Sequence, residues 1–566
     1  MEVSTHSAVF SLELWQQQLK ANVYTSDSDV QHTIRYWFHK DFSQFHDKLT
    51  DFGLSVSLDL EPLVAENHQE GNLPKIENFD KFGRFIRDII HHPSYYQAGD
   101  LIYGSGMLKY LLKPHGLLPC LSLFFLASET GEAGHNCPVA CTAGIIRVLQ
   151  KQPDFPFQKE YLEKLTAPSY LLNVTGAQFL TEIQGGSDVG QNTTLAILEG
   201  ENWRIYGEKW FCSNANAELI FITARYDTTE MGTKGLGLFL IPAQWQDKPN
   251  LFTFRRLKNK LGTKTMATAE IDFEGAYAYP ILPLDKGFHL VMENVLHLSR
   301  LFNAFCVVAM ARRAYFIAYY YAKNREAFSK KIITYPLILE NLSIIKAENT
   351  TLLAGIYATA VLQDHFDASH AEDKSQKLLL RLLVNVQKFL TAKYAVEHIH
   401  HALDVLGGNG VIETFSAMPR LLRDAIVCEN WEGTHNVLFM QILKDMHKYA
   451  VHEVFLKYIA EKIKMLPEDF IYLTCFKKAY ENLQKHIVNF FNLTDHLQTL
   501  EIKHIAHAMG ILFSSIHLAL EAIDQMKKNK NDSKMLCLQL FITLHFEKTH
   551  AKIDQSYLDL LNRLLS

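Results

Sequence analysis

The chain has 566 residues, which is too long for one ordinary hydrophobic core and indicates two to four domains. With 48% hydrophobic and 21% charged residues, its composition is typical of a folded soluble protein and argues against a disordered or fibrous one. The formal net charge of -5 excludes a molecule-wide basic field that recruits nucleic acid, although it leaves a local basic patch open.

Neither a targeting segment nor a membrane span is expected. The first residues, MEVSTHSAVFSLELWQQQ, carry acidic side chains early and no long apolar run, so they match neither a signal peptide nor a transit peptide. The most apolar stretch, Leu301–Ala311, is followed by Arg312 and Arg313 and is too short to cross a bilayer. These features predict a cytoplasmic protein with no membrane partner.

The segment up to about residue 175 is expected to be mostly helical. Apolar residues recur at intervals of three and four in FDKFGRFIRDIIHH (79–92) and in GMLKYLL (106–112). The segment GHNCPVACT carries Cys137 and Cys141, but no second cluster follows at metal-ligand spacing. We therefore interpret these cysteines as reduced, buried thiols on a helix after Pro138, and expect no metal.

Strand patterns begin near residue 176. LAILEGENWRIYGEKWF (195–211) alternates apolar and polar residues on both sides of a Gly-Glu-Asn turn, which predicts a β-hairpin. AELIFITARYD (217–227) and GLGLFLIPA (235–243) are short apolar runs bounded by turn residues, and TAEIDFEGAYAY (268–279) alternates again. Residues 176–290 are therefore expected to form a compact β barrel or sandwich.

Helical periodicity returns at Phe288 and continues to the C-terminal end. Long helices are expected from Phe288 to Asn324, from Ser343 to about Asp367 and from Lys374 to Leu406, the last ending at Gly407. The sequence thus predicts a mainly α protein with a central β domain. Its parts are an N-terminal helical domain (1–175), a middle β domain (176–290), a C-terminal four-helix bundle (291–450) and a helical extension (451–566).

Two polar stretches border the expected β domain. In TEIQGGSDVGQNTT (181–194), the two glycines allow a flat or anionic ligand to approach the backbone, and Ser187 can donate to a phosphate. In GEKWFCSNANAE (207–218), Phe211 and Ser213 together suit the face and edge of a flat ring. The simpler interpretations are an Asx-type turn for the first stretch and a half-buried strand for the second.

Two more stretches lie in the second helical part. In REAFSK, Arg325 is placed to hold a phosphate and Phe328 to support a ring, although such a sequence is more often a solvated helix end. In LGGNGVIETFSAMPRLLRDAIVCENWEGTHN (406–436), Thr434 is a natural N-cap. Glu432 precedes it beside a tryptophan, and burial there raises a carboxylate's pKa toward that of a general base. The simpler interpretation is a surface acid beside a helix N-terminus.

Together these four stretches resemble the acyl-CoA dehydrogenase family in order and spacing. The likeness rests on the TE..GGSD loop, the KWF.S strand, the R..F helix end, and GGNG followed by R-D and WEGT, and it spans about Phe124 to Leu443. Within the family the chain is most similar to the AidB branch, the flavoproteins of the adaptive response to alkylation. The expected helical extension after residue 450 adds to that likeness.

The resemblance implies bound FAD, an N-terminal helical domain, a middle β domain and a C-terminal bundle. It implies that Phe211 packs on the flavin, that Ser213 reaches its N5 edge, and that Arg325, Phe328 and the Gly407–Gly410 loop serve a neighbouring subunit's FAD. The cofactor-binding positions that it implies are Thr181, Gly186, Ser187, Phe211, Ser213, Arg325, Phe328, Gly408, Thr434 and Asn436.

The resemblance also implies a reaction. Glu432 matches the base that takes the α-proton of an acyl thioester while hydride passes from the β-carbon to the flavin, and Arg300 matches an arginine near the active site. Acyl-CoA or a related small molecule is then the substrate, electron-transfer flavoprotein or oxygen the acceptor, and a homodimer or homotetramer the assembly. The chain departs from the family's residues at Ile183, Ser329, Pro336 and Asp404. These departures put contacts to the adenine end of FAD in doubt.

The main alternative is an AidB-like stress flavoprotein that binds DNA and has weak or no dehydrogenase activity. Residues 441–566 hold sixteen Lys and Arg against fourteen Asp and Glu, and only one of the basic residues is an arginine. Phosphate binding needs a concentrated positive face, so this composition gives DNA binding weak support. We therefore rank DNA binding below flavin chemistry, and a purely structural role lower still.

Overall fold

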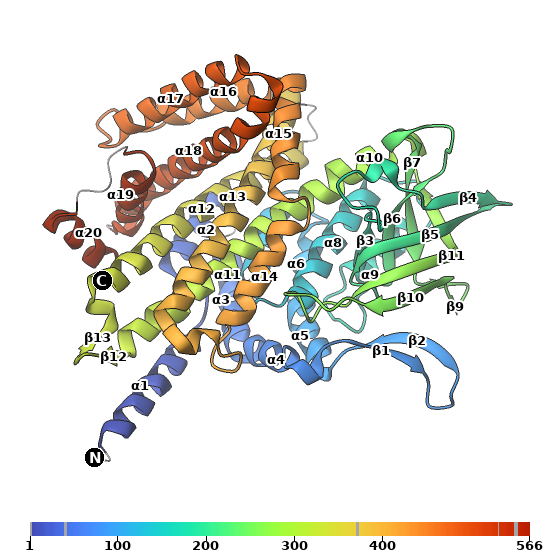
Figure 1. Ribbon diagram of the computed structural model, residues 1–566, viewed down its shortest axis with the longest axis horizontal. Helices are drawn as coiled ribbons and strands as arrows, with labels where there is room; N and C mark the ends of the chain where they lie inside the picture. Colours follow the sequence, from blue (N-terminus) through green and yellow to red (C-terminus); the bar gives the residue numbers. More distant parts are fainter. Residues whose placement is uncertain (1–2, 39–41, 370–372, 530, 548–552, 566) are drawn as a thin grey trace. The chain divides into compact units, whose positions relative to one another are not determined.

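The computed structural model describes residues 3–38, 42–369, 373–529, 531–547 and 553–565. The chain forms two compact units, each assembled from separate pieces of sequence (Figure 1). The first unit contains residues 1–59, 117–131 and 303–566, and the second contains residues 60–116 and 132–302. The four-domain division expected from the sequence stays a prediction.

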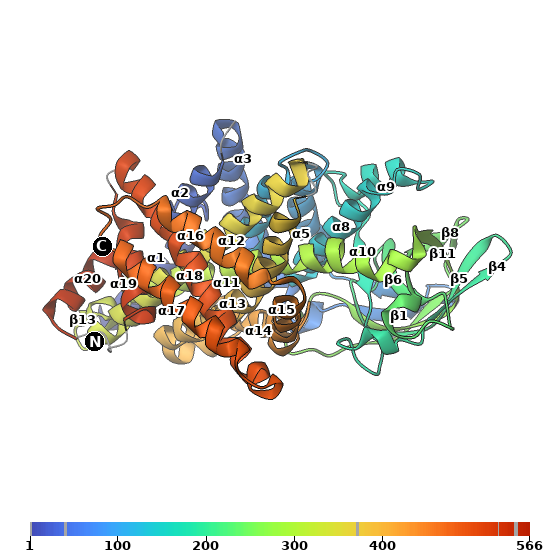
Figure 2. The same ribbon diagram turned by 90° about the horizontal axis from the view of Figure 1, so that it is seen from above.

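The first unit is helical, and the long helix α12 is its centre. α12 packs against α13, α18 and α19, while α17 packs against α18, as Figures 1 and 2 both show. The elements of this unit are α1 (Val3–Leu19), α2 (Ser28–Trp37), α3 (Phe42–Ser55), α7 (Leu117–Ser128), α11 (His297–Asn324, from residue 303), β12 (Glu326–Ala327), β13 (Lys330–Lys331), α12 (Pro336–Ser369), α13 (Lys374–Leu406), α14 (Met418–Asn430), α15 (His435–Tyr449), α16 (Val451–Lys464), α17 (Leu473–Phe491), α18 (Asp495–Asn529), α19 (Ser533–His545) and α20 (Gln555–Leu565).

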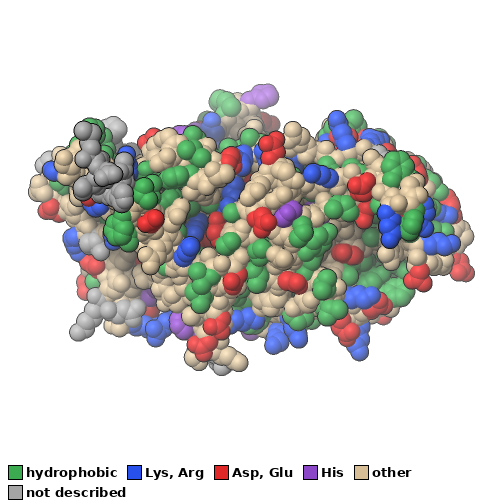
Figure 3. Space-filling model, turned by 90° about the horizontal axis from the view of Figure 1, so that it is seen from below, with side chains coloured by type: hydrophobic (Ala, Val, Ile, Leu, Met, Phe, Trp, Pro, Cys, Tyr) green, Lys and Arg blue, Asp and Glu red, His purple; other side chains and the backbone are tan. Residues whose placement is uncertain are grey.

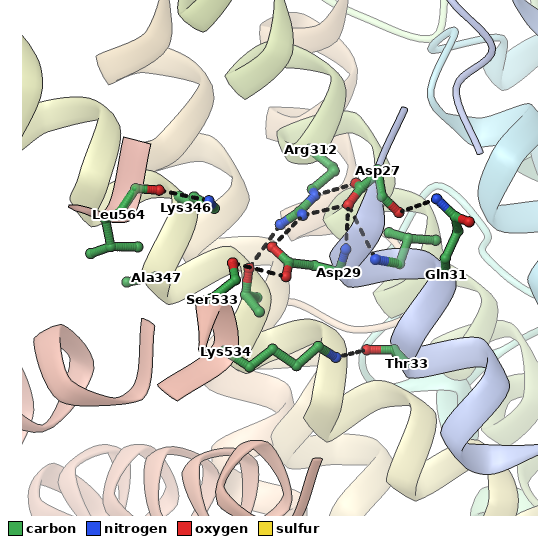
Figure 4. Close-up of polar contacts among 12 residues, drawn as sticks. Asp27, Asp29, Gln31, Thr33, Arg312, Lys346, Ala347, Ser533, Lys534 and Leu564 are labelled. Atoms are coloured by element: carbon green, nitrogen blue, oxygen red, sulfur yellow. Dashed lines mark hydrogen bonds and ion pairs between the residues drawn. The ribbon is translucent and has the colours of Figure 1, made fainter. Parts of the chain in front are cut away.

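A buried ion network joins helices from both ends of the chain inside this unit (Figure 4). Arg312 on α11 donates to Asp27 at 2.7 Å and to Asp29 at 3.1 Å, and all three side chains are almost fully buried. On the other side, the Lys534 ammonium of α19 pairs with Glu521 of α18. Because each buried charge has an opposite partner, the C-terminal helices are part of the same core as α2.

The network also sets the charge of Asp29. Burial by itself raises the pKa of this carboxyl, but Lys346, Arg312 and Lys534 more than offset that and lower the pKa to about 2. An ordinary aspartate has a pKa of about 3.9 in an unfolded chain. The interactions of ionised Asp29 with these cations therefore stabilise the fold above about pH 4, and this contribution is lost as the pH falls toward 2.

The second unit contains the β domain. β7 pairs with both β6 and β11, and β11, β5, β4 and β6 pair in turn, so these five strands form a closed ring. Its elements are α4 (Glu61–Asn67), β1 (Lys75–Phe79), β2 (Phe85–Ile90), α5 (Pro93–Gly104), α6 (Met107–Tyr110), α8 (Ala133–Gln150), α9 (Gln158–Leu165), β3 (Gly176–Phe179), β4 (Leu195–Glu199), β5 (Asn202–Ser213), β6 (Leu219–Arg225), β7 (Leu236–Pro242), β8 (Gln244–Trp245), β9 (Lys248–Pro249), β10 (Phe252–Leu257), β11 (Thr268–Ile281) and α10 (Gly287–Leu290).

Most of the predicted elements are found. The hairpin expected at residues 195–211 is the β4–β5 pair, which turns at Gly200 with φ of +63°. The three expected long helices correspond to α11, α12 and α13, although α12 begins earlier, at Pro336. The first of them is interrupted by a π-helical turn at Val291–Leu296. Cys137 and Cys141 lie on α8, but Pro138 is inside that helix and does not precede it.

The helix predicted at residues 79–92 is wrong, because β1 and β2 form an antiparallel hairpin there. The Asp80 carboxylate accepts backbone N–H groups two and four residues ahead, at 2.8 and 3.0 Å, and Gly83 has φ of +76°. This turn chemistry favours a hairpin. The spacing of three between Phe79, Phe82 and Phe85 suits a helix, but it arises here because these residues lie on the two strands and in the turn that joins them.

Two helices of the described chain are long and apolar enough to span a membrane by length and composition. They cover Leu284–Asn324 and Asp495–Lys528, and 94% and 89% of their most apolar windows are buried inside the protein. The stretch Leu301–Ala311, expected to be too short to cross a bilayer, is thus part of a longer apolar helix. Burial of this extent is what the core helices of a folded domain require.

We expect Arg312→Met to be strongly destabilising, because it leaves two buried carboxylates without their cation. The expected loss is about 3–5 kcal/mol of unfolding free energy at pH 7, measured by urea denaturation. Since Arg312 is one of the cations that lower the pKa of Asp29, this pKa should rise in the variant, and the difference in unfolding free energy between parent and variant should narrow from pH 4 to pH 2. Lys164→Met, which removes an exposed i,i+4 pair with Glu160, is the control and should change little. A difference in unfolding free energy that stays constant with pH would contradict the role of Arg312 in lowering the pKa of Asp29.

Candidate active site

The candidate residues form two sets, one in each compact unit. In the second unit, the 181–194 loop follows β3 and is held by the Glu182 carboxylate. This carboxylate accepts from the backbone N–H groups of Thr193 at 2.7 Å and Thr194 at 3.1 Å, and from the Lys209 ammonium at 2.8 Å. Both members of the ion pair are buried. The start and the end of the loop are therefore joined through one side chain.

The two adjacent glycines of this loop are required for different reasons. A Cβ on Gly186 would stand 2.5 Å from the Thr181 hydroxyl oxygen, so the Thr181 side chain occupies the space of the missing one. Gly185 has φ of +131°, and no described atom lies within 4 Å of where its Cβ would stand. Ser187 beside them is exposed. The loop thus presents open backbone and a hydroxyl, a surface that fits a flat or anionic group.

Phe211 and Ser213 are two residues apart on β5, so they share one face of the strand. Phe211 is 50% exposed, and the Ser213 hydroxyl is 3.3 Å from that of Thr268 on β11. The Lys258 ammonium lies 3.5 Å from the Trp210 ring centroid and 4.8 Å from that of Phe211. An exposed aromatic face beside a hydroxyl is the surface that a conjugated ring system requires.

In the first unit, Arg325 and Phe328 belong to the small β12–β13 hairpin. Its two turn residues, Phe328 and Ser329, have φ of +51° and +64°, the left-handed backbone of a tight hairpin turn. Neither residue is glycine, so the turn is strained. The Phe328 ring is 92% exposed at its tip. Strain and exposure of a large ring together are typical of a contact surface.

Arg325 also lines a hollow of about 330 Å³ together with the end of α13. Asp404 and the glycine-rich turn at Gly407 and Gly408 also line it. No described atom lies within 4 Å of the position that a Cβ would take on either glycine. A cation, a carboxylate and open glycine backbone thus line the same hollow.

Glu432 lies in the short loop between α14 and α15. It has φ of +58°, and Gly433 after it has φ of +103°, so two successive residues adopt left-handed backbone. Its carboxylate oxygen Oε2 is buried from solvent. Trp431 before it donates its indole N–H to Asn303 of α11. The loop thus holds a carboxylate in a strained, partly desolvated position.

Thr434 and Asn436 begin α15. Thr434 stands at the N-cap position as expected, but among the described residues its side chain makes no capping hydrogen bond. Asn436 is exposed in the first turn. Arg300, on the part of α11 that belongs to the second unit, is 5% exposed.

Two other carboxylates on the candidate stretches, Glu182 and Glu413, are already engaged in ion pairs. Burial raises the pKa of Glu182, but Lys209 and the hydrogen bonds of the loop outweigh it and leave the pKa below its usual value. Glu413 accepts from both terminal nitrogens of Arg423. Neither is suited to accept a proton near neutral pH.

Lys209 is the functional residue that the sequence interpretation missed. Its ammonium is fully buried and holds the loop through Glu182. The alternation of β5 places it on the inward face, four residues from the buried Ile205, which is an available signal. Across the described residues, no group of three or more His, Cys, Asp or Glu is placed to hold a metal ion.

Models of three family domains match the chain in succession. Residues 16–171 match the adaptive response protein AidB N-terminal domain, residues 177–276 the acyl-CoA dehydrogenase middle domain, and residues 285–447 the acyl-CoA dehydrogenase C-terminal domain. Together they account for most of the sequence, and they follow the order of the expected segments.

Relatives and solved structures agree with these matches. Acyl-CoA dehydrogenase family member 11 of Caenorhabditis elegans is 26% identical over 93% of this chain and 89% of its own. AidB of Escherichia coli (strain K12) is 28% identical over 70% of this chain and 73% of its own. The structure of Caenorhabditis elegans ACDH-11 in complex with C11-CoA is 24% identical, with a TM-score of 0.86 over 94% of this chain and 92% of that one.

The buried Glu182–Lys209 pair generates a double-substitution test. Glu182→Gln and Lys209→Met should each lower the unfolding free energy by about 3–5 kcal/mol, because each leaves a buried charge alone. The double variant Glu182→Gln/Lys209→Met should lose less than the sum of the two, measured by urea denaturation. Strict additivity would show that the two side chains do not depend on each other.

Proposed function

The chain belongs to the acyl-CoA dehydrogenase family, and from this we propose that it binds FAD and oxidises the α,β-bond of an acyl thioester. Enzymes of this family are oxidoreductases that act on the CH–CH bonds of acyl-CoA. The observation that carries the proposal is the backbone of Glu432. A left-handed glutamate costs about 1–3 kcal/mol, and such strain is found where function requires it.

The residues of both units suit FAD. Gly185 offers open backbone and Ser187 a hydroxyl for the pyrophosphate, and Gly186 makes room for the Thr181 side chain beside them. Phe211 and Ser213 offer a ring face and an edge donor. We assign Thr181, Thr434 and Asn436 to the same cofactor, and Arg325, Phe328 and Gly408 to the cofactor of a neighbouring subunit. When bound, FAD supplies the acceptor for the two electrons that leave the β-carbon.

Glu432 is the proposed base. The α-proton of a thioester is weakly acidic, and a carboxylate whose oxygen Oε2 is shielded from water is a stronger base toward it than a solvated one. In the proposed reaction, the Glu432 carboxylate takes this proton. Arg300 is assigned to the same active site.

The substrate class is acyl-CoA. The C11-CoA in the structure of the Caenorhabditis elegans relative supports a thioester of this kind, and its acyl chain is a first choice for assays. We propose electron-transfer flavoprotein or oxygen as the acceptor that reoxidises the flavin, and a cytoplasmic homotetramer as the working assembly.

A second candidate is an AidB-like stress flavoprotein that binds DNA. The match of residues 16–171 to the AidB N-terminal domain favours it. The charge distribution does not, because Figure 3 shows Lys and Arg interspersed with Asp and Glu over most of the face that it draws. The two candidates differ in one measurement, which is whether any acyl-CoA reduces the flavin.

We expect Glu432→Gln to keep its FAD and lose its reactivity. The glutamine keeps the shape of the side chain but cannot accept a proton, so anaerobic flavin bleaching by C11-CoA should slow by about a hundredfold or more. The absorption spectrum of the purified variant reports its FAD content, and stopped-flow spectroscopy reports the rate. Reduction at the parent rate would place the base elsewhere. A parent protein that no acyl-CoA reduces would favour the stress-flavoprotein candidate.

Arg325→Ala should weaken FAD binding much more than it weakens the fold. A charge-assisted hydrogen bond to a phosphate contributes about 1.5–3 kcal/mol, so the FAD dissociation constant should rise roughly tenfold or more. Thermal unfolding of the apoprotein should be unchanged, and Lys323→Ala on the same exposed helix end is the matched control. Light scattering tests the assembly, because a monomer that retains full FAD contradicts a role in a neighbouring subunit.

A further inference from the structure

We infer that Lys388 is a positioning residue for Glu432, because its ammonium bridges the two backbone segments on either side of it. This inference rests on the proposed role of Glu432 as base. Lys388 lies on α13 and is fully buried. Its Nζ donates to the Glu429 carbonyl at 2.9 Å and to the Gly433 carbonyl at 2.8 Å.

The two carbonyls lie on opposite sides of Glu432 in the chain. Glu429 is in the last turn of α14, where carbonyls have lost their helical N–H partners, and Gly433 is the residue directly after Glu432. One ammonium therefore fixes the distance between the end of the helix and the far side of the loop. Between these two anchors, Glu432 has little room to leave its left-handed conformation.

A second anchor acts on the residue before Glu432. Asn303 of α11 accepts the indole N–H of Trp431 and donates its amide to the Cys428 carbonyl at 3.4 Å. The loop is thus held by side chains from two helices of the same unit, α11 and α13. Of the two side chains Lys388 and Asn303, only Lys388 contacts the backbone on both sides of Glu432.

The electrostatics of the loop favour a cation at this place. A positive charge at a helix C-terminus interacts favourably with the helix dipole, and Lys388 reaches the C-terminus of α14. Burial lowers the pKa of His435, and Lys388 and Lys393 lower it further, to about 4. His435 is therefore neutral at physiological pH and adds no positive charge at this helix end.

The two hydrogen bonds of Lys388 predict the effect of removing its ammonium. A methionine at position 388 fills similar volume but donates nothing, so the carbonyls of Glu429 and Gly433 lose their common partner. The loop can then relax its strained backbone, and the Glu432 carboxylate moves from its place. Displacement of a reacting group by about 1 Å costs on the order of a hundredfold in rate.

The test compares Lys388→Met with Lys534→Met in the full-length holoprotein. Lys534 is an equally buried lysine of the same unit, but it contacts Glu521 and Thr33 and not the loop. Hydrogen–deuterium exchange is followed at backbone amides 431–436, and flavin reduction by C11-CoA is measured per bound FAD. If Lys388→Met does not fold, Lys388→Gln, which keeps a donor but cannot reach both carbonyls, takes its place.

For Lys388→Met we expect about tenfold faster exchange at residues 431–436 and at least a tenfold lower limiting rate of reduction. The half-saturating acyl-CoA concentration and the FAD content should change less than threefold. Lys534→Met should lower global stability but leave both local readouts within about twofold of the parent.

Unchanged exchange at residues 431–436 would overturn the inference, whatever the rate does. A rate loss that is matched by an equal loss of acyl-CoA affinity would also overturn it, because displacement of the base alone does not weaken binding. If no acyl-CoA reduces the parent, the proposed function has failed, and the exchange measurement alone then decides whether Lys388 holds the loop.

Discussion

A buried ammonium must have acceptors, and in both units this requirement fixes a loop that carries candidate site residues. In the second unit the acceptor of Lys209 is the Glu182 carboxylate, which in turn holds the end of the glycine loop. In the first unit the acceptors of Lys388 are backbone carbonyls on the two sides of Glu432. Since a buried charge without a partner costs several kcal/mol, each loop is as firmly placed as the strand or helix that carries the lysine.

Loops fixed in this way are ready before a ligand arrives. A site that must reorganise on binding uses part of the binding energy to do so, whereas a preorganised site keeps it for catalysis. The strained backbone at Glu432 persists for the same reason, because its surroundings determine it more strongly than its own preference does.

The fold was predictable where local signals marked both ends of an element. α13 runs from Lys374 to Leu406 as expected, because Asp373 caps its first turn and Gly407 ends it. The β4–β5 hairpin was predictable from its alternation and its glycine turn. The β1–β2 hairpin was not predictable in this way, because its apolar residues recur at helical intervals and the Asp80 turn decides the structure.

The candidate site was predictable only as a set of motifs. The positions of Thr434 at a helix start and of Phe211 and Ser213 on one strand face follow from short-range patterns. The partners that hold the loops do not, because Lys388 is 45 residues from Gly433 and Asn303 is 128 residues from Trp431. No local sequence pattern identifies the carbonyl to which a buried lysine donates.

The buried network of the first unit has a consequence for how the protein is made. Lys534 and its acceptor Thr33 are 501 residues apart, so the ribosome releases the N-terminal helices long before their partner exists. At 5–20 residues per second the wait is roughly 25–100 s. During that time the part of the α2 surface that Lys534 contacts lacks its buried partner. The first unit is therefore completed only when the last part of the chain has been made.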